Sequence, residues 1–152
     1  MRALIFDGKL RLEREYPKPK PSAGEALLRL RRAGICNTDL ELIGGYMDFS
    51  GVLGHEFVAE VVFGDPRWVG ARVVGEINVA DGACDFCQRG IPSHCRSRKV
   101  VGIAGHQGAF ADYMALSVSN LHRVPDAVTD DQAVFVEPLA AAFQILEAQH
   151  IS

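Results

Sequence analysis

Gly34-Ile35-Cys36-Asn37-Thr38-Asp39 is followed, after a glycine-marked connector, by Gly54-His55-Glu56, and the rest of the chain is organised around this stretch. It offers a thiol, an imidazole and a carboxylate within a short span, with the hydroxyl of Thr38 beside the thiol. These groups are the ligand types of a catalytic zinc site, in which three protein ligands leave a fourth position open for water or substrate. Spacing alone leaves a second interpretation open, in which Cys36 is a small buried hydrophobe and His55 is a structural residue.

Short apolar and alternating runs predict strands on both sides of this stretch. We expect strands at residues 3–6, 10–15, 25–35, 56–63, 71–77, 108–116 and 121–124. Asp7-Gly8 predicts a hairpin turn between the first two strands, and the proline-rich residues 17–21 predict a stiff extended connector. Residues 51–54 are expected to form a loop.

Two regions carry helix signals. Thr38 or Asp39 is expected to cap a short helix that Gly44-Gly45 ends. Thr129-x-x-Gln132 is a capping-box pattern, and Pro138 is expected to interrupt the helix that begins there. The next helix has an apolar face at helical spacing, formed by Leu139, Ala142, Phe143 and Leu146. Many short strands followed by terminal helices predict a β-rich α+β fold, built as a barrel or sandwich.

Length and composition favour one ordinary globular domain. The 152 residues are 48% hydrophobic and 23% charged, with a formal net charge of −3, which argues against a nucleic-acid-binding protein. The N-terminal apolar run ends after four residues, and no apolar segment approaches the ~18 residues of a membrane span, so we expect a cytoplasmic protein. In that compartment the four cysteines are expected to be metal ligands rather than disulfides.

A second cluster of thiols lies in a polar lobe at residues 81–95. Cys84-x2-Cys87-x7-Cys95 supplies three thiolates, one short of a closed tetrahedral zinc site. Asp81 continues the same spacing and is the natural fourth ligand, while His94 is the alternative. A structural zinc would supply the folding energy that such a lobe lacks. The other interpretation is a metal-free, reduced and mobile lobe, because a hard oxygen weakens a site of soft ligands.

Taken in order, these motifs resemble the catalytic domain of the zinc-dependent medium-chain alcohol and polyol dehydrogenases. The matching segments are Gly34–Asp39, Gly54–Glu56, Val69–Val73, the Cys84/Cys87/Cys95 lobe, Gly108–Tyr113 and Glu137–Leu139. They cover almost the whole chain. The resemblance implies a partly open GroES-like barrel over residues 1–152, with the lobe at 81–95 as an insertion. It implies that helices at 129–150 lead towards a nucleotide-binding domain.

The resemblance also implies roles for the residues of the first stretch. Cys36 and His55 would be zinc ligands, and Glu56 would be a third ligand or a neighbouring carboxylate that swings onto the metal. Glu137 stands where the family has its last zinc-site residue, a cysteine in some members and a glutamate in sorbitol, threonine and glucose dehydrogenase relatives. A glutamate there points to polyols and hydroxy amino acids as substrates.

Thr38 matches the hydroxyl that takes the substrate proton into a relay. The sequence departs from the family pattern at three nearby positions. Glu41 stands where many members have a histidine that ends the relay, Asn37 replaces a basic residue that some members place on the cofactor pyrophosphate, and Asp81 replaces the first cysteine of the lobe.

The implied cofactors are one or two Zn²⁺ ions and, in the full-length enzyme, NAD or NADP. No strand in this sequence is followed by the GxGxxG turn of a dinucleotide-binding domain. We therefore expect the metal-holding part of a dehydrogenase of small alcohols or polyols, inactive alone, with a homo-oligomer possible in full-length form. The alternative is a non-catalytic GroES-like module that binds zinc or a protein partner. Zinc-free quinone-reductase-like chemistry is disfavoured, because those relatives lack the Cys36 and His55 positions.

Overall fold

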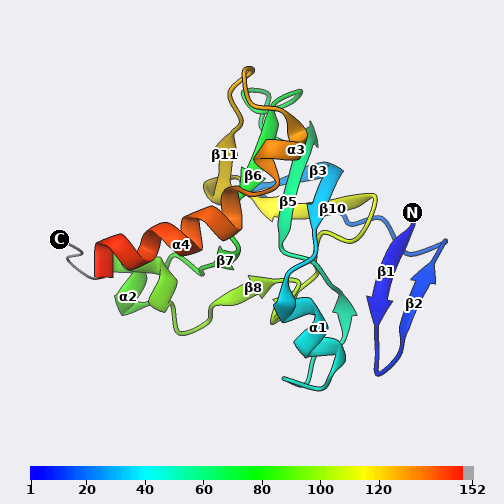
Figure 1. Ribbon diagram of the computed structural model, residues 1–152. Helices are drawn as coiled ribbons and strands as arrows, with labels where there is room; N and C mark the ends of the chain where they lie inside the picture. The colour runs from blue at the N-terminus through cyan, green and yellow to red at the C-terminus, as the bar shows by residue number, and fades with distance from the viewer. Residues whose placement is uncertain (149–152) are drawn as a thin grey trace.

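A five-stranded antiparallel sheet carries the main core in the computed structural model, which describes residues 1–148. Its strands run in the order β10-β3-β5-β6-β11 (Figure 1). Their bounds are Glu25–Gly34 (β3), Glu56–Phe63 (β5), Arg72–Gly75 (β6), Tyr113–Ser117 (β10) and Leu121–Arg123 (β11). Leu28, Val61 and Leu116 are fully buried on its inner face, so burial of apolar surface stabilises this sheet.

Two smaller sheets flank the first. One has the order β2-β1-β4 and the other the order β7-β8-β9, in which β8 and β9 are parallel. Their strands are Ala3–Phe6 (β1), Leu10–Glu13 (β2), Gly51–Val52 (β4), Asn78–Val79 (β7), Lys99–Val101 (β8) and Gly105–His106 (β9). The hairpin expected at Asp7-Gly8 is present between β1 and β2. The strands β7 to β9 were not expected, because each is too short to show a period.

The helices are few and mostly short. They are Asn37–Ile43 (α1), Asp85–Gln88 (α2), Asp130–Ala133 (α3) and Val136–Ala148 (α4), with 3-10 turns at Pro92–His94 and Val118–Asn120. Figure 1 shows α1 at the end of β3 and α4 projecting away from the sheets. None of the helices among residues 1–148 is long and apolar enough to cross a membrane. The β-rich fold with few short helices confirms the expected fold class.

The ladder between β3 and β5 is irregular in a way that matters for the site. Leu30 pairs with Ala59, but Arg32 pairs with Val58, so the register shifts by one residue between Leu30 and Arg32. After this bulge, Gly34 lies opposite Glu56.

Four sequence predictions were wrong in detail, one of which is the strand expected at residues 108–116, because β10 begins only at Tyr113. The N-cap of α1 is Cys36, not Thr38 or Asp39, because the Asp39 carboxylate accepts a hydrogen bond from the Cys36 N–H three residues back. Residues 51–54 contain the short strand β4 rather than only a loop. Pro138 does not interrupt a helix, because α4 begins at Val136 and a proline in a first turn forfeits no internal hydrogen bond.

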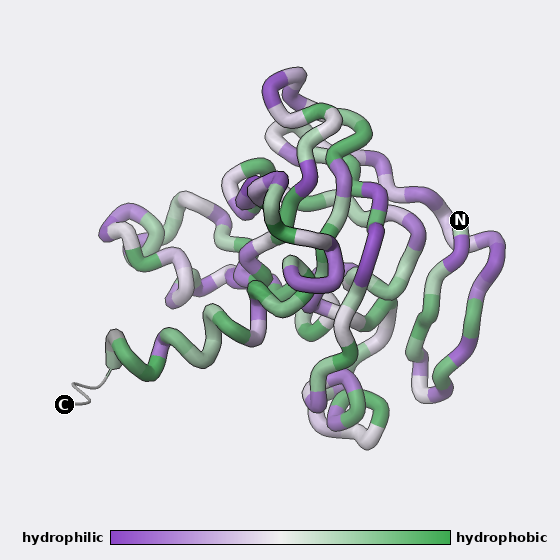
Figure 2. The backbone as a smooth tube through the Cα atoms, turned by 45° about the horizontal axis from the view of Figure 1, so that its top comes forward, coloured by the Kyte–Doolittle hydropathy of each residue, from purple (hydrophilic) through white to green (hydrophobic). Residues whose placement is uncertain are grey.

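The C-terminal helix has the expected spacing but no partner for its apolar face. Thr129 caps α3 through a hydrogen bond from the Gln132 N–H, as the capping box predicts. Leu139, Phe143 and Leu146 of α4 are all more than half exposed, and Figure 2 shows hydrophobic residues recurring along this helix. The last part of the helical segment expected at 129–150 lies outside the described residues.

Candidate metal sites

The first candidate site forms where β3 ends and β5 begins. Cys36 follows β3 directly and caps α1, while His55 and Glu56 open β5. Because Gly34 pairs with Glu56, the strand register places these three side chains together. One ligand atom from each of Cys36, His55 and Glu56 lies within 4.8 Å of the others. The structure thus brings Cys36 together with His55 and Glu56, which lie on a separate strand.

Asp39 connects the two segments that form this site. Asp39 is 1% exposed, and its carboxylate accepts hydrogen bonds from the Cys36 N–H at 3.0 Å and the Gly54 N–H at 3.1 Å. The same carboxylate lies 3.6 Å from Nδ1 of His55, which is an electrostatic contact rather than a hydrogen bond. Sequence reasoning noticed an acid beside the thiol but missed this bridging role. The acid three residues after a cap position was the available signal.

His55 is buried and has an unsatisfied nitrogen. The residue is 3% exposed, and its Nδ1 has no hydrogen-bond partner among the described residues. Burial lowers the pKa of His55, but the Asp39 carboxylate and then the Cys36 thiol outweigh this effect and raise it to about 9. With Nδ1 facing Asp39, Nε2 is the nitrogen left for a metal.

The remaining residues expected at this site lie at different distances from it. The Thr38 hydroxyl is 3.6 Å from the Cys36 sulfur. Glu41 is exposed on α1, where its carboxylate accepts a hydrogen bond from the Asn37 amide at 3.3 Å, and the structure does not bring it to the thiol.

Glu137 lies near this site but does not belong to the group of close ligand atoms formed by Cys36, His55 and Glu56. It is half-buried in the first turn of α4. Burial raises its pKa, and so do the carboxylates of Glu56 and Glu76, while His55 opposes the shift. Glu137 is therefore within electrostatic reach of His55 and Glu56.

The second candidate site is the lobe around α2. Asp81, Cys84, Cys87 and Cys95 each offer a ligand atom, and these atoms lie within 4.8 Å of one another. The sulfurs of Cys84 and Cys87 are 3.5 Å apart, and Oδ1 of Asp81 is 3.4 Å from the Cys87 sulfur. The backbone N–H groups of Cys87 and Arg96 lower the pKa of the Cys84 thiol to about 7. A low thiol pKa favours the thiolate form that binds zinc.

Asp81, rather than His94, joins the three thiols of the lobe. Its Oδ1 accepts hydrogen bonds from the N–H groups of Ala83 at 2.8 Å and Cys84 at 3.1 Å, which hold its pKa well below the usual range. The His94 ring instead lies 5.9 Å from the ring of Phe86. All four cysteines of the chain are free thiols.

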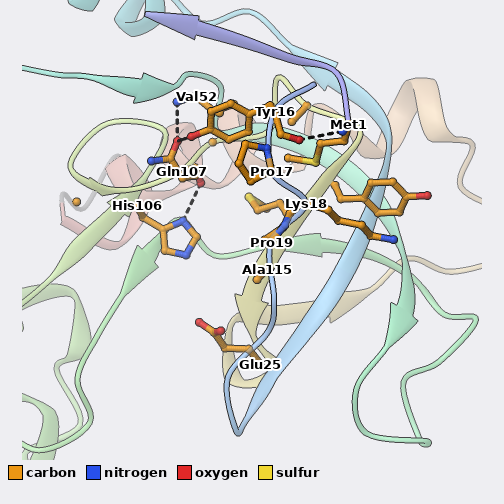
Figure 3. Close-up of a pocket in the computed structure, with 15 residues that line it drawn as sticks. Met1, Tyr16, Pro17, Lys18, Pro19, Glu25, Val52, His106, Gln107 and Ala115 are labelled. Carbon is orange, nitrogen blue, oxygen red and sulfur yellow. Dashed lines mark hydrogen bonds between the residues drawn. The ribbon is translucent and has the colours of Figure 1, made fainter. Parts of the chain in front are cut away.

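Two pockets lie apart from the group formed by Cys36, His55 and Glu56. One, of about 450 Å³, lies between the proline-rich connector and β10, with Tyr16, Pro17, Pro19 and Gln107 among its lining residues (Figure 3). None of the proposed metal ligands lines it. The other, of about 480 Å³, lies between β6 and α4, where Glu137 is part of its lining.

The chain is similar to known proteins over most of its length. Residues 22–126 match the alcohol dehydrogenase GroES-like domain. The starvation-sensing protein RspB of Escherichia coli is 35% identical over 143 residues, which are 88% of this chain and 41% of that protein. The L-threonine 3-dehydrogenase of Shewanella loihica is 32% identical over 138 residues, which are 84% of this chain and 40% of the enzyme.

A solved structure extends the likeness to three dimensions. The crystal structure of an alcohol dehydrogenase from E. coli CFT073 complexed with NADH has a TM-score of 0.91 and 30% sequence identity. The superposition covers 100% of this chain and 46% of the crystallised one. The chain thus spans less than half the length of the relatives it matches. By sequence and by structure, it belongs to the alcohol dehydrogenase GroES-like domain family, the catalytic domain of the zinc-dependent medium-chain dehydrogenases.

Proposed function

We propose that this chain is the metal-holding part of a zinc-dependent dehydrogenase that oxidises a small alcohol or polyol, with NAD or NADP as the hydride acceptor. One observation carries the proposal: a thiol, an imidazole and a carboxylate converge within 4.8 Å of one another. This donor set fits Zn²⁺, which prefers sulfur and nitrogen ligands and accepts a carboxylate oxygen.

The ligands of the catalytic zinc would be Cys36 Sγ, His55 Nε2 and the Glu56 carboxylate. Glu137 is the further candidate, because it lies within electrostatic reach of the others on a separate helix. When bound, the zinc supplies Lewis acidity that makes a substrate hydroxyl easier to deprotonate. The lobe residues Asp81, Cys84, Cys87 and Cys95 would hold a second, structural zinc.

The chain's own residues would orient the site and move the proton. Asp39 holds the Cys36 and Gly54 backbone and faces His55, which keeps the imidazole in one orientation. The Thr38 hydroxyl, beside the Cys36 sulfur, would accept the proton of the substrate. Glu41 lies one helical turn further along α1 at the surface, where it would pass that proton to solvent.

The substrate and the cofactor are inferred from relatives and from Glu137. A glutamate at this position and the likeness to an L-threonine 3-dehydrogenase favour a polyol or a hydroxy amino acid. Because the matched relatives are more than twice as long, we assign nucleotide binding to protein beyond these residues. We place the protein in the cytoplasm, a reducing compartment that suits four free thiols. We also propose that the full-length form is a homo-oligomer and binds neither nucleic acid nor membrane.

Metal analysis tests the proposal directly. The purified chain would be loaded with Zn²⁺, and its zinc content measured by native mass spectrometry beside those of Cys36→Ser and Cys84→Ser. We expect two zinc ions per chain, with one lost in each variant. Zinc that survives in full in Cys36→Ser would refute the catalytic site. Zinc binding without any dehydrogenase activity in the full-length protein would favour the non-catalytic module.

A further inference from the structure

The missing side chain of Gly34 leaves the space in which the Glu56 carboxylate lies. Gly34 is the last residue of β3 and stands opposite Glu56 in the β5 ladder. A Cβ added to Gly34 would overlap Oε2 of Glu56 and would lie 3.1 Å from its Cβ and 3.3 Å from its Cδ. The Glu56 side chain therefore folds across the bare face of Gly34.

That contact, rather than the backbone conformation, is what requires glycine here. Gly34 is not among the glycines with positive φ, whereas Gly54, in the same site, has a φ of 93°. An L-residue could adopt the backbone conformation of Gly34 without strain. What an alanine could not do is leave Oε2 of Glu56 in place.

The position of this carboxylate has a chemical consequence. Glu56 is only 8% exposed, and one of its carboxylate oxygens belongs to the group of donors that includes Cys36 and His55. This carboxylate lies against Gly34 on one side and within 4.8 Å of the ligand atoms of Cys36 and His55 on the other. Displacing it from Gly34 changes its distance from the other two donors.

We propose that Gly34 is a positioning residue of the catalytic metal site, because its bare face seats the Glu56 carboxylate beside Cys36 and His55. The inference rests on the proposed function, since it requires that these donors hold a metal. It adds a residue that carries no ligand atom to the set that determines the metal's surroundings.

Gly34→Ala tests this, because the added methyl group meets the far end of a flexible side chain and the chain should still fold. We expect the affinity for Co²⁺ and Zn²⁺, measured by chelator competition, to fall about tenfold, as for other changes that misplace groups around a metal. The visible absorption of the Co²⁺ form should shift as well. Cys36→Ser, measured in parallel, gives the metal binding that is due to the lobe alone. This contribution is subtracted from the binding measured for the other proteins.

A double-mutant cycle separates positioning from general damage. In a Glu56→Gln background the carboxylate is already lost, so Gly34→Ala should change the affinity by less than about twofold. Gly44→Ala is the matched control, because Gly44 also has a negative φ, of −74°, and its added Cβ would come no closer than 3.3 Å to another atom. It should leave metal affinity unchanged.

Two results would overturn the inference. One is a loss of affinity that is equal in the wild-type and Glu56→Gln backgrounds, and the other is no loss at all. If Gly34→Ala does not fold, the double variant Gly34→Ala/Glu56→Ala removes the overlap and should restore folding. If the double variant does not fold either, the inference is refuted as well. If the wild-type chain binds no more metal than Cys36→Ser, the proposed function itself is refuted. This outcome differs from a wild-type site that binds metal with an affinity that Gly34→Ala does not change.

Discussion

Asp39 is the residue on which the geometry of the first site most depends. Two backbone N–H groups from different segments donate to its buried carboxylate, and His55 faces it. Replacing this buried carboxylate by an amide should lower the stability of the fold, because the amide NH2 group would face one of the N–H donors that the carboxylate now accepts from. Asp39 therefore links the fold of the site to its chemistry.

We expect Asp39→Asn to lower zinc affinity by about 10- to 100-fold, the range seen when partners of metal-binding histidines are changed. It should also destabilise the chain by about 1–3 kcal/mol, because one buried donor loses its acceptor. Chelator competition and urea unfolding measure the two effects. Asp48→Asn, at an exposed position, is the control. Unchanged zinc affinity in Asp39→Asn would contradict the role of Asp39.

The protonation of His55 predicts how metal binding depends on pH. Its pKa in the metal-free fold is raised to about 9 from 6.5. The stability that protonated His55 contributes is therefore fully present below pH 6.5 and is lost as pH rises towards 9. A metal must displace this proton, so affinity for Zn²⁺ should rise with pH between those values, by up to about tenfold per pH unit for this one proton. Calorimetry in buffers of different ionisation enthalpy would count the protons released, and zero protons at pH 7 would contradict it.

At the scale of elements, the lobe around α2 combines the proposed metal ligands with contacts that need no metal. Asp81 accepts hydrogen bonds from the backbone of Ala83 and Cys84, and Arg96 pairs with Asp85 through two hydrogen bonds at 2.8 and 3.0 Å. These contacts connect residues of the lobe without a metal. Asp81 is thus both a proposed ligand and an acceptor of the hydrogen bonds that form the turn.

We expect Asp81→Cys to bind zinc in the lobe more tightly, because a fourth thiolate suits this metal better than a carboxylate. Asp81→Asn is the matched variant, since it keeps an acceptor for the two N–H groups but loses the charge. We expect Asp81→Asn to lower the zinc affinity of the lobe clearly but to change the hydrogen exchange of the loop amides only slightly. Chelator competition gives the zinc affinities, and hydrogen exchange of the Ala83 and Cys84 amides reports the loop. Equal zinc affinity in all three proteins would show that Asp81 is not a ligand.

The apolar face of α4 contributes little to the stability of the described fold. Leu139, Phe143 and Leu146 are more than half exposed, whereas Leu116 in β10 is fully buried. We expect Leu139→Gln to change the free energy of unfolding by no more than about 0.5 kcal/mol, and Leu116→Ala to cost about 2–5 kcal/mol. Urea unfolding measures both. A large loss in Leu139→Gln would mean that the helix packs against the sheets in solution.

Local patterns predicted the elements better than their pairing. The alternation of residues 25–35 and 56–63 indicated two strands, and the motif around Cys36 and His55 indicated which side chains to examine. The bridging of Asp39 to Gly54 and the contact of Gly34 with Glu56 depend on residues distant in the sequence, whereas the capping by Cys36 is a local contact with Asp39. The exposure of α4 could not be predicted, because helical spacing defines an apolar face but not what covers it.

At the scale of the whole molecule, the chain carries the proposed metal ligands, and we assign the hydride acceptor of the proposed reaction to protein beyond these residues. We expect the zinc-loaded 152-residue chain to reduce neither NAD⁺ nor NADP⁺ in the presence of secondary alcohols, polyols or L-threonine. Absorbance of the reduced nicotinamide is the measurement, and a full-length relative is the positive control. Turnover by the chain that disappears in Cys36→Ser would contradict this expectation.

The bulge in β3 gives this strand one residue more than the pairing of the site requires. Without the shift between Leu30 and Arg32, continuing the earlier register would set Gly34 opposite His55 instead of Glu56. The bulge takes up the one residue by which β3 exceeds β5 over this span, so a regular ladder with the same pairing of Gly34 and Glu56 needs one residue fewer in β3. Among descendants of such a sequence, one codon can therefore be lost from this strand without changing which residue lies opposite Glu56.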